Sequence, residues 1–310
     1  MNPLQRLFPV DHIVVADGGW GAELLARGLA LGESADLWNL SRPDVVEAVA
    51  RSFVEAGAEV LLTNTFQANA IALGRVGMAD EVVAVNRRGV EISRSAAATA
   101  VDRTVHVFGS IGPVGLGRND KVDVAEAFAA QARAHADAGV EALVFETFGD
   151  LDEAVLAVAA ARPIGPPIVV SFHFDDRTGS PLTLSGATPE QAARAVQKAG
   201  ADAVGANCGA GPGPFPELCR RLRTASDLPV WIKPNAGVPT IENGRASYPT
   251  GPEAFAAILP VLTVAGASLV GGCCGAGPEY VRALVTARDR IPGPAVHDAG
   301  IPIRARSASE

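Results

Sequence analysis

The 310-residue sequence predicts an α/β fold, and within that class a single (β/α)8 TIM barrel, from three observations. Short apolar runs rich in β-branched residues alternate with Ala-rich helical patterns from end to end, which is typical of parallel β/α units. The length suits one barrel of about 250 residues with insertions. Polar and reactive residues follow the apolar runs repeatedly, and barrels of this kind place their catalytic sites at that end of the strands.

Eight apolar runs are the expected strands, and eight Ala-rich patterns are the expected helices. The strands are expected at residues 12–16, 59–63, 105–108, 142–145, 168–172, 203–206, 229–232 and 268–270. The helices are expected near residues 45–55, 80–97, 124–137, 151–161, 189–199, 215–224, 253–264 and 279–290. One barrel domain therefore covers residues 1–293. The tail, residues 294–310, has no apolar periodicity, and we expect it to be flexible.

A short repeat marks four of the turns from a helix to the next strand. Its copies read Ala-Gly-Ala-Glu or a close variant, at residues 56–59, 138–141, 199–202 and 265–268. The glycine is expected to end each helix in the left-handed conformation. The copies precede the second, fourth, sixth and eighth strands, as four double β/α units require. Residues 188–191, Thr-Pro-Glu-Gln, predict a helix start with a capping box.

Composition and charge argue against several kinds of partner. The net charge is −8 and the sequence has no basic run, which disfavours nucleic acid and anionic membranes. No apolar stretch reaches the length of about 20 residues that spans a bilayer, and the first residues do not resemble a secretion signal. Four cysteines are too few for a disulfide framework, which indicates a reduced, cytoplasmic protein. No expected helix carries an excess apolar face, so the sequence predicts no particular oligomeric state.

Three cysteines follow expected strands and form a candidate zinc site. Cys208 closes the sixth apolar run, and Cys273 and Cys274 stand among glycines after the eighth. Three thiolates suit zinc and leave its fourth tetrahedral position open, as in catalytic rather than structural sites. The alternative is three unligated cysteines or a vicinal disulfide. Cys219 lies within a helical pattern, where we expect a buried core thiol.

Acidic residues and glycines at the same end of the strands indicate an amino acid site. Asp17 and Glu146 directly follow apolar runs and are candidate acceptors for an ammonium group. Gly18 and Gly19 offer backbone amides that could receive a carboxylate. Four further candidates, either cavity donors or turn residues, are Thr147, Asn64, Asn207 and Asn235.

Seven motifs resemble the homocysteine S-methyltransferase family, which includes betaine–homocysteine methyltransferase and the homocysteine domain of cobalamin-dependent methionine synthase. In order they are Asp-Gly-Gly at 17–19, Asn-Thr-Phe-Gln-Ala-Asn at 64–69, Gly-Ser-Ile-Gly-Pro at 109–113, Phe-Glu-Thr at 145–147, Gly-Ala-Asn-Cys at 205–208, Pro-Asn-Ala-Gly at 234–237 and Gly-Gly-Cys-Cys-Gly at 271–275. The resemblance spans about residues 11–291. It implies that the three cysteines bind zinc, and that Asp17, Glu146 and nearby amides hold homocysteine.

The resemblance implies a zinc-dependent methyltransferase that converts homocysteine to methionine. The sequence ends after one barrel, so we expect S-methylmethionine or another sulfonium as the donor. Betaine is a weaker candidate because aromatic residues make up only 5% of the sequence; Trp20, Trp38 and Phe66 are the residues that could surround a quaternary ammonium. A methylcorrinoid on a separate corrinoid protein is a third donor. The rival interpretations are a zinc hydrolase and a thiol-rich zinc-binding barrel without transferase activity.

Overall fold

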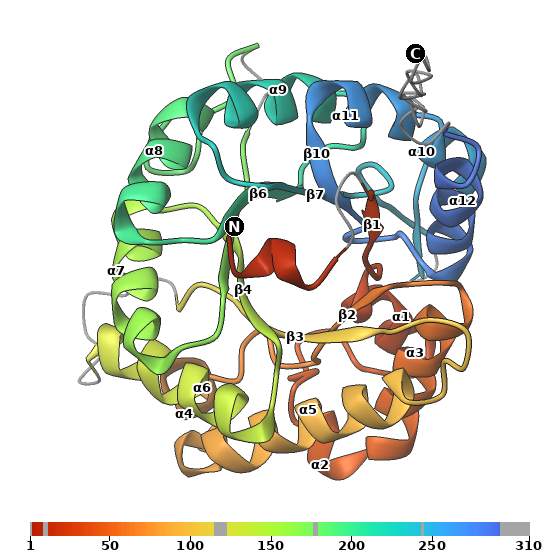
Figure 1. The fold of residues 1–310 in the computed structure, drawn as a ribbon. Helices are drawn as coiled ribbons and strands as arrows, with labels where there is room; N and C mark the ends of the chain where they lie inside the picture. The colour runs from red at the N-terminus through yellow and green to blue at the C-terminus, as the bar shows by residue number, and fades with distance from the viewer. Residues whose placement is uncertain (1, 9–11, 115–122, 176–178, 243–244, 292–310) are drawn as a thin grey trace, which may run out of the picture.

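The computed structural model describes residues 2–8, 12–114, 123–175, 179–242 and 245–291. Eight parallel strands in this part of the chain form one curved sheet, with helices around it (Figure 1). The strand order is β1-β10-β7-β6-β5-β4-β3-β2. The bounds are β1 (Val14–Val15), β2 (Val60–Leu62), β3 (His106–Ile111), β4 (Ala142–Phe148), β5 (Ile168–Phe172), β6 (Ala203–Cys208), β7 (Val230–Pro234) and β10 (Ala267–Val270). The predicted barrel is confirmed, and each expected strand overlaps an observed one.

The sheet closes into a barrel between β1 and β2. Ala16 pairs with Val60 in an isolated parallel bridge. The backbone N–H of Glu59 donates to the Val15 oxygen at 2.7 Å, and that of Asp17 donates to the Val60 oxygen at 3.0 Å. Two backbone hydrogen bonds around this bridge therefore join the first strand to the second, although β1 itself is only two residues long.

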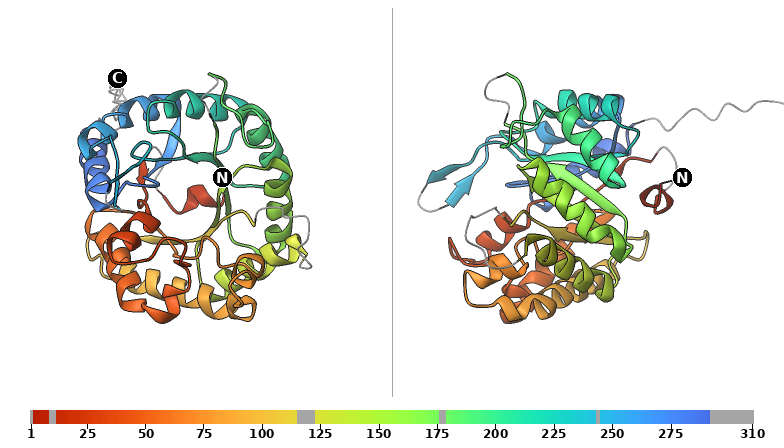
Figure 2. Two further views of the ribbon diagram at one scale, coloured as in Figure 1. Left: turned by 180° about the vertical axis from the view of Figure 1, so that it is seen from behind. Right: turned by 90° about the vertical axis from the view of Figure 1, so that its left-hand side faces the viewer.

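The longer helices form a ring outside the strands (Figures 1 and 2). Their bounds are α3 (Pro43–Glu55), α5 (Val82–Ala97), α6 (Val124–Ala138), α7 (Leu151–Ala161), α8 (Pro189–Ala199), α9 (Phe215–Ala225), α11 (Leu259–Ala265) and α12 (Pro278–Arg288). The helix expected at 253–264 is wrong as one unit, because it is split into α10 (Pro252–Ala256) and α11. Pro260 lies in the first turn of α11, where it is tolerated, and it could not continue a helix from α10.

Several short elements were not expected from the sequence. They are the helices α1 (Trp20–Ala26), α2 (Trp38–Ser41) and α4 (Ala70–Gly74), the 3-10 turns η1 (Leu4–Arg6), η2 (Ala79–Glu81) and η3 (Arg162–Ile164), and the hairpin of β8 (Thr240–Glu242) with β9 (Arg245–Ser247). Most of these lie in the connections that follow strands. The hairpin projects from one end of the barrel, and η1 covers the other (Figure 2, right).

The glycines of the four-copy repeat end their helices as predicted. Gly57, Gly139, Gly200 and Gly266 have φ angles of 102°, 89°, 102° and 97°. The capping box at Thr188 is also confirmed, with Gln191 as its reciprocal partner. The repeat therefore marks helix ends through a backbone conformation that glycine adopts without steric cost.

The core has two layers, one inside the barrel and one between the strands and the helices. The inner layer includes Phe108 and Trp231, whose rings stack at 6.3 Å between centroids. Leu4 of η1 is 1% exposed and belongs to this inner cluster. Because η1 lies across the opening in Figure 1, it closes the N-terminal end of the barrel with an apolar side chain.

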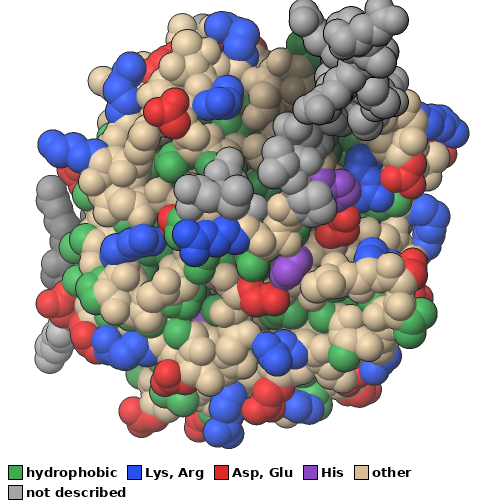
Figure 3. All heavy atoms as spheres, viewed as in Figure 1, with side chains coloured by type: hydrophobic (Ala, Val, Ile, Leu, Met, Phe, Trp, Pro, Cys, Tyr) green, Lys and Arg blue, Asp and Glu red, His purple; other side chains and the backbone are tan. Residues whose placement is uncertain are grey.

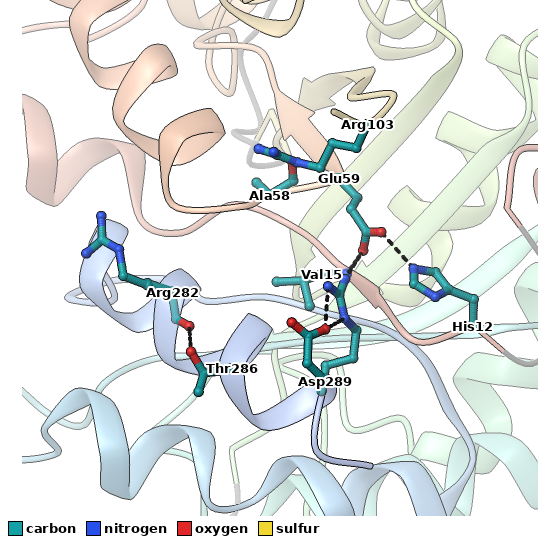
Figure 4. Close-up of polar contacts among 9 residues, drawn as sticks. His12, Val15, Ala58, Glu59, Arg103, Arg282, Thr286 and Asp289 are labelled. Atoms are coloured by element: carbon teal, nitrogen blue, oxygen red, sulfur yellow. Dashed lines mark hydrogen bonds and ion pairs between the residues drawn. The ribbon is translucent and has the colours of Figure 1, made fainter. Parts of the chain in front are cut away.

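Glu59 joins three parts of the chain at that N-terminal end (Figure 4). Its carboxylate accepts from His12 Nε2 at 2.7 Å and from the Val15 backbone N–H at 3.0 Å. Arg288 Nη1, near the end of α12, lies 2.6 Å from the same group. The acidic residue of the repeat therefore braces the seam between β1 and β2. Glu141 and Asp202, at the same place in two other copies, accept from backbone N–H groups of Val107 and Ile168.

The surface at this end carries acidic and basic side chains side by side, with apolar ones between them (Figure 3). It shows no continuous field of one sign, in agreement with the absence of a basic run. Among the described residues no helix is long and apolar enough to cross a bilayer. The expected flexible tail, residues 294–310, lies outside the described residues.

Candidate active site

A cavity of about 650 Å³ opens at the C-terminal end of the barrel. Its wall comes from the ends of β2, β3, β4, β6 and β7, the loop after β10, and the two connections around α1. The volume is typical of a small-molecule site. The cavity therefore lies where catalytic sites of barrels occur, at the C-terminal ends of the strands.

Cys208, Cys273 and Cys274 meet at one side of this cavity. Their sulfur atoms all lie within 4.8 Å of one another, and the Sγ atoms of Cys208 and Cys273 are 3.2 Å apart. Cys208 is the last residue of β6, and the pair follows β10. Both strands flank β7 in the sheet, and Pro234 of β7 pairs with Cys208 and accepts from the backbone N–H of Cys273 at 2.8 Å. Sheet order thus brings together residues 65 positions apart.

The strand ends bend sharply where these residues stand. Cys208 and Thr147 both have φ of 65°, and they are the non-glycine residues of the described chain with positive φ. Gly275 has φ of 79°, and a Cβ atom there would lie 2.3 Å from the ring of Tyr248. Left-handed conformations in non-glycine residues are costly and concentrate at functional sites. Here they turn the Cys208 and Thr147 side chains toward the cavity wall.

Two asparagines hold the bent segments together. Asn207, 1% exposed, accepts from the Thr147 backbone N–H at 2.9 Å and donates to Thr147 Oγ1 at 2.7 Å and Cys208 Sγ at 3.4 Å. Asn235 accepts from the Cys274 backbone N–H at 2.9 Å and donates to the Gly209 oxygen at 2.8 Å. Neither asparagine belongs to the cavity wall. Both therefore lie behind the cysteines, as turn residues would, rather than on the wall of the cavity.

The cysteine cluster fits a zinc ion. A tetrahedral site with Zn–S bonds of about 2.3 Å has sulfur atoms about 3.8 Å apart, which lies between the observed 3.2 Å and the 4.8 Å limit. Hydrogen bonds from Cys208 and Cys273 lower the pKa of Cys274 to about 3. The same contacts with neighbouring cysteines raise the pKa of Cys208 well above its ordinary value. Cys274 is therefore the cysteine of the cluster that loses its proton most readily, and Cys208 resists losing its own.

Glu146, at the end of β4, is a cavity carboxyl group. It is 8% exposed, and Ser110 Oγ donates to its Oε1 at 2.5 Å. Burial, helped by the nearby Cys273, raises the pKa of Glu146 to about 7 although the charge of Lys233 acts in the opposite direction. A cationic group bound in the cavity would therefore favour the ionised form of Glu146, and the carboxylate and the cation would stabilise each other.

Asp17 is fully buried and behind the cavity wall. Lys233 Nζ donates to its Oδ1 at 2.5 Å, while Trp20 Nε1 and the Leu62 backbone N–H donate to Oδ2 at 2.7 and 2.8 Å. Lys233, 2% exposed, does line the cavity. Burial lowers the pKa of Lys233, but the charges of Asp17 and Glu146 outweigh it and raise that pKa above its ordinary value. The sequence analysis assigned no role to Lys233. The one feature of the sequence that could have indicated a role is that this lysine directly follows the apolar run at residues 229–232.

The expected glycines line the cavity, but close packing also requires them. A Cβ atom on Gly18 would lie 2.0 Å from the Ala276 oxygen, and one on Gly19 would lie 2.4 Å from the Cys273 oxygen. The Gly19 N–H donates to the Ala276 oxygen at 2.9 Å. These glycines therefore let the segment after β1 lie against the cysteine loop. Asn64 also lines the cavity and donates to the Ala35 oxygen at 2.8 Å.

The part of the cavity away from the strands is built by the segment before α2, which carries Glu33 and Asp36. Asp36, 5% exposed, accepts from the Gln67 backbone N–H at 2.9 Å, and burial raises its pKa to about 6. A hydrogen bond from Trp38 lowers the pKa of Glu33. Arg75 and the rings of Trp20 and Phe66 also line the cavity, whereas Trp38 does not. No apolar periodicity in the sequence predicted that this segment lines the cavity.

Comparison with known proteins identifies the family of this chain. The family model described as homocysteine S-methyltransferase matches residues 14–288. The chain is 33% identical to methionine synthase of Mycobacterium tuberculosis, over 92% of this chain and 25% of that protein. It is 34% identical to the Mycobacterium leprae methionine synthase, over 89% of this chain and 24% of that protein. The chain thus spans about a quarter of the length of these relatives.

Solved structures show the same likeness. The metallated form of the homocysteine methyltransferase MmuM from Escherichia coli superposes with a TM-score of 0.74 at 26% identity, covering 92% of this chain and 99% of that one. The family model covers every strand described above. The chain therefore belongs to the homocysteine S-methyltransferase family.

Proposed function

We propose that this protein is a zinc-dependent homocysteine S-methyltransferase that makes methionine from a small cationic methyl donor. The convergence of Cys208, Cys273 and Cys274 at the cavity, in a member of this family, is the observation that carries the proposal. The three sulfur atoms would hold zinc and leave its fourth position for a substrate sulfur. Zinc supplies there the positive charge that keeps a thiol deprotonated at neutral pH. The metallated form of the similar MmuM supports this assignment.

Glu146 is the proposed acceptor for the ammonium group of homocysteine. It lines the same cavity as the cysteines and is close enough to Cys273 for that thiol to raise its pKa. Thr147 and Asn64 line the same cavity, and Gly18 offers a backbone amide for the carboxylate, since the N–H of Gly19 already donates to the Ala276 oxygen. Asp17 has its partners within the protein, so its proposed contribution is to orient Lys233 rather than to bind substrate directly.

The charges of the cavity support a sulfonium donor. Glu33 and Asp36 line the part built by the segment before α2, and Trp20 and Phe66 add aromatic surface that favours a cation. Arg75, on the same wall, suits a donor carboxylate. S-Methylmethionine carries groups that match these residues: a sulfonium and an ammonium for the acidic and aromatic side chains, and a carboxylate for Arg75. In the reaction the S–CH3 bond of the sulfonium breaks, a new S–CH3 bond forms on the homocysteine sulfur, and the donor leaves as a neutral thioether.

A methylcorrinoid is the second candidate donor, favoured by the methionine synthases to which the chain is 33% and 34% identical. The deciding experiment incubates the zinc-loaded protein with homocysteine and, separately, S-methylmethionine, S-adenosylmethionine, betaine or methylcobalamin, and measures methionine. We expect S-methylmethionine to give the highest kcat/KM. Turnover with methylcobalamin alone would reject the cationic donor, and no methionine from any donor would reject the proposed function.

A further inference from the structure

A chain of hydrogen bonds leads from helix α6, outside the barrel, to Glu146 in the cavity. His135 of α6 is fully buried, and its Nε2 lies 3.0 Å from Thr65 Oγ1. Thr65 Oγ1 donates to the Ser110 carbonyl oxygen at 2.8 Å and lies 2.6 Å from Thr63 Oγ1. Ser110 Oγ in turn donates to Glu146 Oε1 at 2.5 Å. The chain therefore crosses from α6 past the ends of β2 and β3 to β4.

The two threonines take the place of a strand beside Ser110. The β2–β3 ladder ends with the Thr63 backbone N–H donating to the Phe108 oxygen at 3.0 Å. Beyond that point the Ser110 N–H donates to Thr63 Oγ1 at 3.0 Å, and the Ser110 oxygen accepts from Thr65 Oγ1. A buried backbone group without a partner is costly, so these hydroxyls complete the pairing that β2 no longer provides. The position of Ser110, and of the hydroxyl that contacts Glu146, thus depends on Thr65.

These contacts determine which atom carries each proton shared among Thr63, Thr65 and His135. The single hydroxyl proton of Thr65 goes to the Ser110 carbonyl oxygen, which can only accept. Thr65 Oγ1 is therefore an acceptor for both of its other neighbours, Thr63 Oγ1 and His135 Nε2. It follows that His135 carries its proton on Nε2. Its Nδ1 is buried with no hydrogen-bond partner among the described residues. If Nδ1 carried the proton, a buried N–H group would have no acceptor, so the unprotonated form of this nitrogen is favoured.

The backbone of β3 fixes where the His135 ring can lie. A Cβ atom on Gly109 would be 2.6 Å from His135 Nδ1 and 2.8 Å from its Cγ, closer than real contacts of this kind allow. Glycine at 109 therefore admits the ring against the strand, with Nε2 aimed at Thr65. Burial lowers the pKa of His135 to about 3, which keeps the ring neutral as this arrangement requires.

We propose that His135 is a positioning residue for substrate binding: as the Nε2–H tautomer it orients Thr65, which holds Ser110 and, through its hydroxyl, the carboxylate of Glu146. This inference rests on the proposed function, since it takes Glu146 as the partner of the homocysteine ammonium group. A carboxylate held in one orientation before substrate arrives loses less freedom on binding. His135 thereby acts on homocysteine affinity without touching the substrate or the cysteines.

Two variants test the link from opposite directions. His135→Phe keeps a ring but removes the donor, and Gly109→Ala keeps the donor but displaces the ring. With zinc-loaded protein we expect the homocysteine Kd, measured by calorimetry, and its KM to rise about fivefold in each, as for one lost hydrogen bond. We expect kcat within about twofold of the unchanged protein and the same zinc content. In Thr65→Val, adding His135→Phe should cause no further loss, because both act through one contact.

Val196→Ala in α8 is the control for a purely structural role, since Val196 is fully buried and outside this network. It should lower the unfolding midpoint and leave Kd unchanged. If His135→Phe also lowers the unfolding midpoint but leaves the homocysteine Kd unchanged, the inference about His135 is overturned and the proposed function is not affected. Nitrogen-15 NMR of the histidine ring should show Nε2 protonated; a proton on Nδ1 would also overturn it. Failure of the unchanged protein to bind homocysteine would instead overturn the proposed function and the role of His135 together.

Discussion

Replacing Lys233 by methionine tests whether the buried ion pair with Asp17 holds the site together. The two side chains are 2% and 0% exposed, and Lys233 Nζ lies 2.5 Å from Asp17 Oδ1. Methionine preserves most of the buried stem, so little cavity is created. The change leaves a buried carboxylate without its cation, which typically costs about 3–5 kcal/mol. Because Trp20 and the Leu62 backbone still donate to Asp17, we expect the lower end, a loss of about 3 kcal/mol in the free energy of unfolding.

Urea unfolding of Lys233→Met, Asp17→Asn and the double variant measures this coupling. With both charges gone, the double variant should recover about 2 kcal/mol of the loss in Lys233→Met, because no charge remains buried without a partner. Lys198→Met, at an exposed position in α8, is the matched control and should change stability by less than about 0.5 kcal/mol. The reasoning is refuted if Lys233→Met lies within about 1 kcal/mol of the unchanged protein, or if adding Asp17→Asn destabilises it further.

Three further changes have defined outcomes. Cys274→Ser should lose zinc, seen by metal analysis, together with methyl transfer, whereas Cys219→Ser, in the core of α9, should keep both; an active, zinc-containing Cys274→Ser would contradict the ligand set. Glu59→Gln should lower the free energy of unfolding by about 1 kcal/mol without changing kcat, because Glu59 braces only the N-terminal seam; an unchanged urea midpoint would show that the brace contributes nothing. The folded pKa of His135, about 3, lies below its unfolded value of 6.5, so the stability from neutral His135 is present above pH 6.5 and lost as pH falls. Between pH 6.5 and 5 the unchanged protein should lose about 1.6 kcal/mol more than His135→Phe, and equal losses in urea would contradict the depressed pKa.

The strands and the cysteine cluster were predictable because both are written locally in the sequence. Each strand is an apolar run, and each helix end in the four-copy repeat needs a glycine at positive φ. The cysteines followed from the same logic, since strand ends of a parallel barrel share one face. Pro260 also carried a local signal, and the expected helix at 253–264 should have been divided there.

The rest of the site depends on contacts that no local pattern records. Lys233 and Asp17 are 216 residues apart and meet only because β1 and β7 both flank β10. His135 looks like any histidine on a helix until Gly109 and Thr65 are placed against it. The segment that carries Asp36 has no apolar period, and the hairpin of β8 and β9 has exposed residues in and next to its strands, at 238–240 and 246–247, rather than an apolar run. Such features follow from the closed barrel rather than from their own sequence.

The charge balance of the cavity connects these observations to the choice of donor. In the proposed site, three thiolates would carry one negative charge more than a divalent zinc ion neutralises, and a substrate thiolate would add another. Lys233 offsets Asp17, and the homocysteine ammonium group would offset Glu146, so this excess would remain in the cavity that Glu33 and Asp36 also line. A sulfonium donor is drawn toward that excess. Methyl transfer from it also neutralises a cation and an anion together, which a site of low dielectric constant favours. A neutral donor would gain neither effect, and the acidic wall before α2 would then have no part in the reaction.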